Sequence, residues 1–169
     1  FLSVIEQSGY AIQTKDYYSP MHGNDAQEWV YKALKTIYSD IKEGKKIDGV
    51  VIIRGWGGSS GIIWQNDLDI AKGICYMPVP VIVAVGHTAD KFVLDDIAYF
   101  SAKTPTDAAY FLVSLYEQTE TDIQQMLENI HVRTKESINN LLTSIPSLYE
   151  NINIRIGALL DTIQQNIHL

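Results

Sequence analysis

Arg54 and the glycine-rich turn that follows it form the pattern best suited to chemistry in this chain. They come directly after a short apolar run, Val50–Ile53. A guanidinium is a permanently charged, forked donor that suits phosphate oxygens, and glycines let consecutive backbone amides approach an anion closely. The pattern therefore predicts a phosphate or phosphodiester site, in which Arg54 binds the anion. The turn supplies the other expected contacts, from Gly55, Gly57, Gly58 and Ser59.

His87 and Asp90 follow a second apolar run, Val81–Val85. Asp90 lies three residues after His87, and at that spacing its carboxylate can reach the imidazole. A histidine oriented by a carboxylate is a general acid or base near neutral pH, and either group could be the base. His22, in a loop earlier in the chain, is a further candidate for binding substrate at the same site.

Each of these features also has a plainer interpretation. Taken alone, Arg54 could be a surface or salt-bridging residue, and the glycines an ordinary tight turn. Trp56 and Trp64 could stack on bases, but packing is the preferred interpretation. Asp95 and Asp96 could ligate a divalent ion, yet no HxH, HExxH or paired-cysteine spacing accompanies them. We therefore predict no metal site and expect at least one of the two acids on a solvated helix face.

The elements that position these residues follow from the spacing of apolar side chains. Amphipathic helices and apolar strands are predicted to alternate, at Ala26–Glu43, Val50–Arg54, Asp67–Met77 and Val81–Val85. This order is typical of βαβ units, so we predict an α/β domain with a small, parallel, Rossmann-like sheet. Neighbouring parallel strands end at the same edge, where open α/β sheets bind ligands. Arg54 and His87 should therefore share that edge.

Three local predictions complete the α/β domain, which we assign to residues 1–105. Phe1–Ser8 is expected to form the end of a helix, with Gly9 as its stop signal. Tyr10–Tyr18 is expected to form a strand. Cys75, on the second long helix, is expected to be a buried structural thiol.

The pattern changes at residues 106–169, where apolar residues recur at steps of three and four. This spacing predicts a long amphipathic helix or coiled coil. Successive four-residue steps around Ile152 and Ile156 depart from a strict heptad, like a stutter. Pro146 is expected to kink the helix or divide it in two. A helix this long has little of its own domain to pack against, so it predicts a partner-binding arm in a homo- or hetero-oligomer.

The charge balance argues against a broad nucleic-acid-binding surface. The net charge is −7, with −2 in residues 1–105 and −5 in residues 106–169. Nonspecific affinity for nucleic acid comes largely from Lys and Arg side chains that neutralise phosphates. If the substrate is a nucleic acid, most of the affinity for it should therefore come from outside these residues. No apolar run could cross a bilayer and no secretory signal is evident, so we expect a cytoplasmic protein with no membrane partner. Because the chain starts at Phe1, we expect it to be a fragment.

The two motifs together resemble those of the exodeoxyribonuclease VII large subunit. That family has Arg-Gly-Gly-Gly-Ser after a buried strand, and Ile-Pro-Val-Ile-x-Ala-Val-Gly-His-x-x-Asp after it. The counterparts here are Arg54–Ser59 and Val79–Asp90, and a Thr-Pro pair within Lys103–Ala109 stands where the family begins its coiled coil. The resemblance runs from Phe1 to Ala109, and the His22-Gly23 loop resembles a Gln-Gly turn of the family.

The resemblance implies exonucleolytic hydrolysis of single-stranded DNA, from either end, to short 5′-phosphorylated oligonucleotides. It implies no strict cofactor requirement, although a divalent metal stays open. Arg54, His87 and Asp90 match the catalytic positions of the family, and the helical arm matches the region that carries its small subunits. A further catalytic aspartate and an OB-type DNA-binding domain would precede Phe1, so the fragment alone is expected to be inactive.

The chain also departs from the family pattern. Trp56 is an extra residue in the turn, Gly61-Ile62-Ile63 stands where the family commonly has Glu-Asp-Leu, and Ser101 replaces an arginine. These departures favour a second hypothesis, a catalytically degenerate scaffold whose arm recruits partners. A third hypothesis is a small-molecule phosphate binder on the same sheet.

Overall fold

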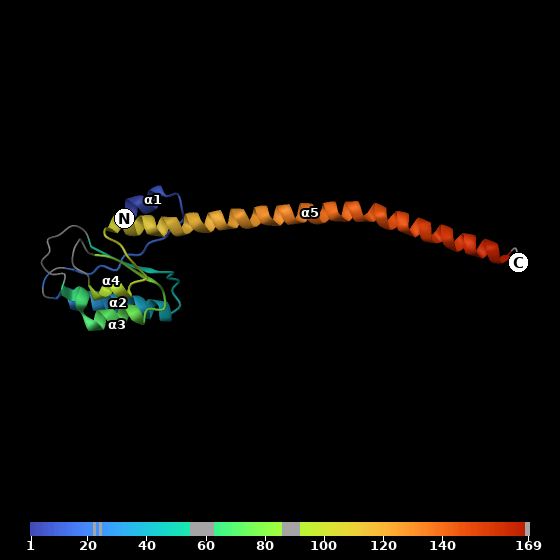
Figure 1. Cartoon of the computed structure of the whole chain (residues 1–169). Helices are drawn as coiled ribbons and strands as arrows, with labels where there is room; N and C mark the ends of the chain where they lie inside the picture. The colour runs from blue at the N-terminus through green and yellow to red at the C-terminus, as the bar shows by residue number, and fades with distance from the viewer. Residues whose placement is uncertain (22, 24, 55–62, 86–91, 168–169) are drawn as a thin grey trace. The chain divides into compact units, whose positions relative to one another are not determined.

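The computed structural model describes residues 1–21, 23, 25–54, 63–85 and 92–167. The chain divides into two compact units, Phe1–Glu117 and Gln118–Leu169, which we call the first and second units. The first unit contains a sheet with helices packed on it, and the second consists of the rest of the long helix α5, Pro105–Ile167 (Figure 1). Among the described residues, no helix combines the length and apolarity needed to span a membrane.

A small parallel sheet forms the centre of the first unit. Its described strands are β1, Val50–Ile53, β2, Val81–Ala84, and β3, Phe100–Ser101, in the order β1-β2-β3. Both pairs are parallel, with Val50 opposite Val81 and Ile53 opposite Ala84. The predicted α/β class and parallel pairing are confirmed. The two-residue strand β3 was not predicted, because it is too short to show a pattern of its own.

Alternate residues of β1 and β2 point to opposite faces of the sheet, as strand geometry requires. One face contributes Val50, Ile52, Val81 and Val83 to the largest apolar cluster. The other face contributes Val51, Ile53, Ile82 and Ala84 to a second cluster. Both faces are therefore covered, which explains why these strands are continuously apolar.

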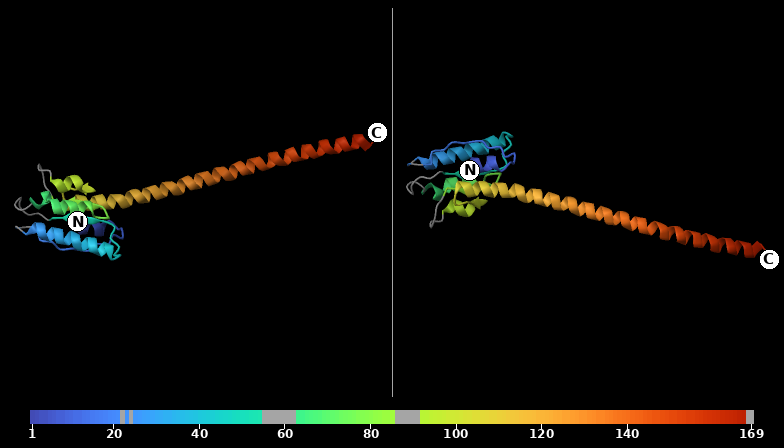
Figure 2. Two further views of the ribbon diagram at one scale, coloured as in Figure 1. Left: turned by 90° about the horizontal axis from the view of Figure 1, so that it is seen from below. Right: turned by 90° about the horizontal axis from the view of Figure 1, so that it is seen from above.

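Three helices cover the first face: α2, Ala26–Lys42, α3, Leu68–Cys75, and α4, Val93–Ile97. Seen from below in Figure 2, they lie side by side. Helices α2 and α3 each bury one apolar stripe, as expected for the predicted amphipathic helices: Ala26, Val30, Leu34 and Ile37, then Ile70, Ala71 and Ile74. The glycine that stops α2, Gly44, has φ +90°, a conformation that L side chains rarely adopt.

The second face is covered by the start of α5, and α1, Leu2–Gln7, packs on α5. Ala108 packs on the sheet cluster, while Ala109 and Val113 pack against Ile5 of α1. The first turns of α5 therefore belong to the first unit, which extends to Glu117. The predicted helix at Phe1–Ser8 is confirmed, and Gly9 follows it with φ +76°.

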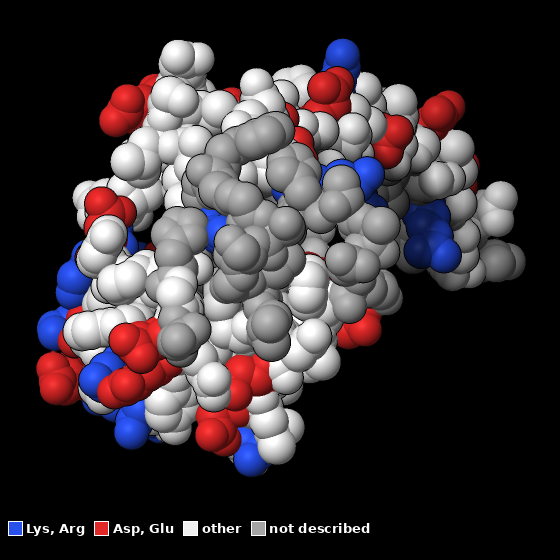
Figure 3. Space-filling model, turned by 90° about the vertical axis from the view of Figure 1, so that its left-hand side faces the viewer, with Lys and Arg blue, Asp and Glu red and all other residues white. Residues whose placement is uncertain are grey.

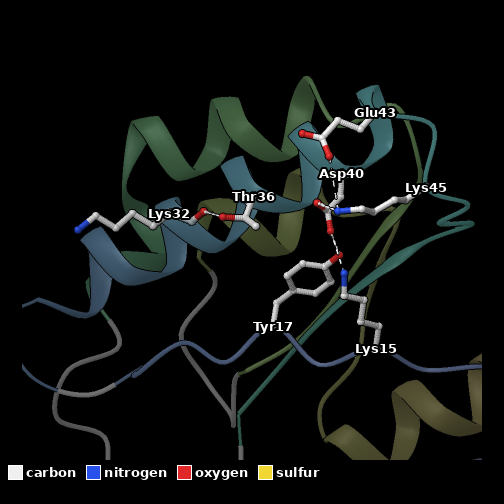
Figure 4. Close-up of polar contacts among 7 residues, drawn as sticks. All are labelled: Lys15, Tyr17, Lys32, Thr36, Asp40, Glu43 and Lys45. Atoms are coloured by element: carbon white, nitrogen blue, oxygen red, sulfur yellow. Dashed lines mark hydrogen bonds and ion pairs between the residues drawn. The ribbon is translucent and has the colours of Figure 1, made fainter.

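Two predictions for the first unit are wrong. Tyr10–Tyr18 contains no strand. Its contacts to α2 come from side chains instead, since Lys15 and Tyr17 both bind Asp40 (Figure 4). Cys75 is exposed rather than buried, because it lies one residue past Ile74 and has turned off the stripe that faces the sheet.

The second unit is one exposed helix. Every described side chain from Ser114 to Asn166 is exposed, and apolar side chains line it from Ile123 to Ile163. The helix runs through Pro146 without a break. Of the two outcomes predicted for this proline, the division is wrong, and the kink stays a prediction. A proline removes one backbone hydrogen bond, and the carbonyl it frees in this exposed helix can bind water.

Candidate functional site

Arg54 lies at the carboxyl edge of the sheet. Its backbone N–H donates to the carbonyl of Ala84 at 3.3 Å, which extends the β1–β2 pairing by one residue. The residue is only 8% exposed, so the alternative that Arg54 is a surface residue is wrong. Burying a guanidinium requires polar partners. A buried arginine at the edge where parallel sheets bind ligands is therefore a candidate anion-binding group.

The neighbouring strand ends at the same edge. Because Ile53 pairs with Ala84, Arg54 and Val85 leave the sheet at adjacent positions. The predicted convergence of the two strand ends on one edge is confirmed for these described residues. The other predicted site residues lie outside the described part of the chain: Gly55, Gly57, Gly58 and Ser59 after β1, His87 and Asp90 after β2, and His22.

The described chain resumes after residues 55–62 in a short 3₁₀ helix, η1, Ile63–Asn66. Trp64 is 5% exposed and belongs to the cluster under the first face of the sheet. Packing is thus confirmed as its role, in preference to base stacking. Gln65 is 0% exposed, and neither atom of its amide has a hydrogen-bond partner among the described residues.

After residues 86–91 the chain resumes at Phe92 and enters α4. Asn66 Oδ1 accepts a hydrogen bond from the backbone N–H of Val93 at 3.0 Å. Asp95 Oδ2 accepts from the N–H of Phe92 at 3.0 Å, and Asp95 Oδ1 accepts from Ser101 Oγ at 2.6 Å. Asp95 is therefore occupied in holding the start of α4, and Asp96 is the exposed acid of the pair.

Gln65 and Asn66 were not predicted as residues of the site. Their only signal was a run of polar residues, Gln65-Asn66-Asp67, ahead of α3. That run reads as an ordinary helix start, and only the structure shows that Gln65 is buried and that Asn66 contacts α4.

Carboxylates occupy the helix starts at this end of the unit. Asp67 Oδ1 caps α3 by accepting from the N–H groups of Asp69 and Ile70, at 2.9 and 3.0 Å. Gln27 of α2 donates to the other oxygen of Asp67. Because the first amides of α3 are already bound, its N-terminus is not an open anion site. On this end, acidic and basic side chains are interspersed (Figure 3).

The carboxylates that the structure describes near this edge form no metal-ligand set. Among the described residues, no group of three or more His, Cys, Asp or Glu could hold a metal ion. The charged group that the structure describes at this edge is the buried guanidinium of Arg54, which suits an anion better than a cation.

The sequence of the chain is similar to those of known proteins. Residues 1–169 match the family described as "Exonuclease VII, large subunit". The exodeoxyribonuclease 7 large subunit of Pseudothermotoga lettingae is 32% identical over 132 residues, which cover 78% of this chain and 32% of the relative. That of Lactobacillus gasseri is 32% identical over 145 residues, which cover 82% of this chain and 31% of the relative.

The match extends beyond the motifs at the sheet edge. It continues through α5 to residue 169, further than the stretch to Ala109 in which the motif resemblance was found. The chain spans about a third of the length of these curated relatives. A parallel sheet that ends in Arg54 and a long helix after it are thus parts of one matched region, and the chain belongs to the exonuclease VII large-subunit family.

Proposed function

We propose that this chain is the central catalytic part of an exodeoxyribonuclease that hydrolyses single-stranded DNA to 5′-phosphorylated oligonucleotides. Membership of the family supports this proposal, since the curated relatives are named exodeoxyribonucleases. The observation that carries it furthest is the position of Arg54, buried at the carboxyl edge and paired to β2, whose chain continues into Gly86-His87. The first unit would then be a Rossmann-like catalytic domain.

The proposed chemistry is the attack of water on the scissile phosphorus. The bond from phosphorus to the 3′ oxygen breaks, which leaves the phosphate on the 5′ end of the product. Arg54 and the amides of Gly55 and Gly57–Ser59 bind the phosphate and stabilise the charge that develops on it. His87 and Asp90 form the acid–base pair, in which one proton leaves the attacking water and one reaches the departing oxygen.

The DNA itself would be held mainly elsewhere. Only 8% of Arg54 is exposed, and the described surface at this end mixes both signs of charge (Figure 3). A phosphate would therefore meet Arg54 within the edge, while affinity for the strand comes from other parts of the protein. His22 is proposed as an additional substrate contact. The proposed reaction includes no step through a metal ion.

The second unit would serve as the docking surface for partners. Apolar side chains along it are exposed, among them Ile123, Ile145 and Ile163 at 47–59%. A coiled coil with the exonuclease VII small subunit would bury them, and the resulting oligomer is proposed to act in the cytoplasm.

A catalytically degenerate scaffold is the second candidate. It is favoured by Ser101, which stands where the family has an arginine and here donates to Asp95 at 2.6 Å. In this alternative the α/β unit keeps its fold and the helix still recruits partners, but no DNA is cut.

One assay separates the two candidates. The full-length polypeptide, with and without the small subunit, is incubated with end-labelled single-stranded DNA and a chelator. Release of acid-soluble oligonucleotides supports the enzyme, and small-subunit binding without release supports the scaffold. In the active protein, His87→Ala should lower turnover by at least about 10²-fold, whereas normal turnover of this variant would refute the proposed site.

A further inference from the structure

Asn66 links two parts of the chain that are far apart in sequence. Its Oδ1 accepts from the N–H of Val93 at 3.0 Å, across 27 residues. Val93 is the first residue of α4, and the first N–H groups of a helix have no acceptor within the helix. Asn66 thus acts as a cap that is supplied by η1 instead of by the helix's own N-terminal flank.

The start of α4 depends on such contacts. The helix has only five residues, far fewer than a helix needs to be stable alone. The N–H of Phe92 is held by Asp95, and Asp95 is held by Ser101. Two consecutive backbone N–H groups, of Phe92 and Val93, are therefore fixed at the point where the described chain resumes after residues 86–91.

The bond from Asn66 to Val93 joins the parts of the chain that follow the two segments of the proposed site, residues 55–62 and 86–91. Upstream of them, the N–H of Arg54 is bonded to Ala84, which joins the ends of β1 and β2. Downstream, Asn66 follows residues 55–62 and Val93 follows residues 86–91, and these two are bonded to each other. The chain is thus tied together on both sides of the glycine-rich turn and of the His87–Asp90 motif.

We propose that Asn66 is a positioning residue of the nuclease: its hydrogen bond holds Val93, and with it the start of α4, which follows the His87–Asp90 motif in the sequence. This inference rests on the proposed function. Reacting groups that are displaced by about 1 Å can lose about 10²-fold in rate. The bond therefore acts on turnover, while affinity for DNA, which comes mainly from elsewhere, is left nearly unchanged.

Two substitutions at this position test the proposal in the full-length polypeptide with its small subunit. Asn66→Leu keeps the size of the side chain and removes the acceptor, so kcat on single-stranded DNA should fall by about 10- to 100-fold, with KM changed less than about threefold. Asn66→Asp keeps an acceptor oxygen and should restore most of kcat.

A matched control separates positioning from loss of stability. Asp40→Asn weakens the unit about 20 Å along α2 from Gln27, away from the proposed site, and should leave kcat unchanged below its melting temperature. Wild-type kcat in Asn66→Leu, or a loss no larger than in Asp40→Asn at equal folded fraction, would overturn the inference.

The His87→Ala variant distinguishes failure of this inference from failure of the proposed function. If His87→Ala also kept full turnover, the nuclease proposal itself would fall. An inactive His87→Ala beside a fully active Asn66→Leu would overturn the positioning role alone.

Discussion

The buried polar side chains at the two ends of α2 differ in how many hydrogen-bond partners they have. Near its carboxyl end, Asp40 is 7% exposed and accepts from Lys15 at 2.9 Å, Tyr17 at 2.6 Å and Lys45 at 2.5 Å (Figure 4). Near its amino end, Gln27 meets Asp67. The adjoining η1 contains Gln65 at 0% exposure, and its side-chain amide has no hydrogen-bond partner among the described residues.

This difference indicates that the Asp40 end contributes mainly to stability and the other end mainly to function. A buried carboxylate with three donors is fully compensated, and it ties Lys15, Tyr17 and Lys45 to the end of α2. A buried amide without partners lowers stability. Such uncompensated groups are expected where a site must meet something other than the folded chain. The η1 end of α2, with the Gln65 amide, has this character among the described residues, and the Asp40 end does not.

The largest expected effect is a loss of activity when Arg54 of the proposed site is replaced. Arg54→Lys keeps the charge but loses the planar fork that matches a phosphate. In the full-length protein, kcat on single-stranded DNA should fall by about 10²-fold, as measured by release of acid-soluble label. Circular dichroism should show an unchanged fold. Unaltered turnover in this variant would mean that Arg54 does not contact the reacting phosphate.

The next effect is on stability, at the opposite end. Asp40→Asn removes the charge that three donors share, so the melting temperature should fall clearly while kcat per folded molecule stays at the wild-type value. Thermal unfolding and the same DNA assay measure both quantities. A drop in activity with no drop in melting temperature would reverse the assignment of the two ends.

The stability difference between wild type and Asp40→Asn should also depend on pH. Hydrogen bonds from Lys45, Tyr17 and Lys15 hold the pKa of Asp40 well below its usual range. A lowered pKa in the folded state stabilises the protein above the unfolded value, about 3.9, and this stabilisation is lost as the pH falls towards the folded pKa. The difference in melting temperature should therefore shrink below about pH 4.

The basic limit of this pH range is set by Lys15. Its pKa is raised to about 12 by hydrogen bonds with Tyr17 and Asp40. A raised pKa stabilises the folded state below the unfolded value, about 10.4, and this contribution is lost as the pH rises through the folded one. Melting curves from pH 3 to pH 11 should show a plateau between the two limits. A difference that stays constant down to pH 3 would contradict this account.

The smallest expected effect is a gain in stability at Gln65. Gln65→Met replaces an amide without described partners by an apolar side chain of similar length, which should raise the free energy of unfolding by about 1 kcal/mol. Chemical denaturation measures this change. If the variant is instead less stable, Gln65 makes a hydrogen bond that contributes to the fold, and the contrast between the two ends is weaker than described.

Much of the α/β unit could be predicted because its signals are local. The stripes Val30–Ile37 and Ile70–Ile74 repeat at the helical period, and the runs at Val50 and Val81 are short and continuously apolar. The order of these elements predicted parallel pairing, and the register then brings Arg54 beside the end of β2. These features need only residues that are close in sequence, or a chain order that admits few topologies.

The sequence by itself therefore determined the helices, the two main strands and the edge at which Arg54 lies. Tertiary structure decided which side chains are buried and which distant residues meet: the exposure of Cys75, the strand-free path of Tyr10–Tyr18 and the bond from Asn66 to Val93. The physical reason is that each of these depends on neighbours brought together by packing. Asn66 and Val93 are 27 residues apart. No periodicity in the sequence predicts that the side chain of Asn66 and the backbone N–H of Val93 will lie within hydrogen-bonding distance.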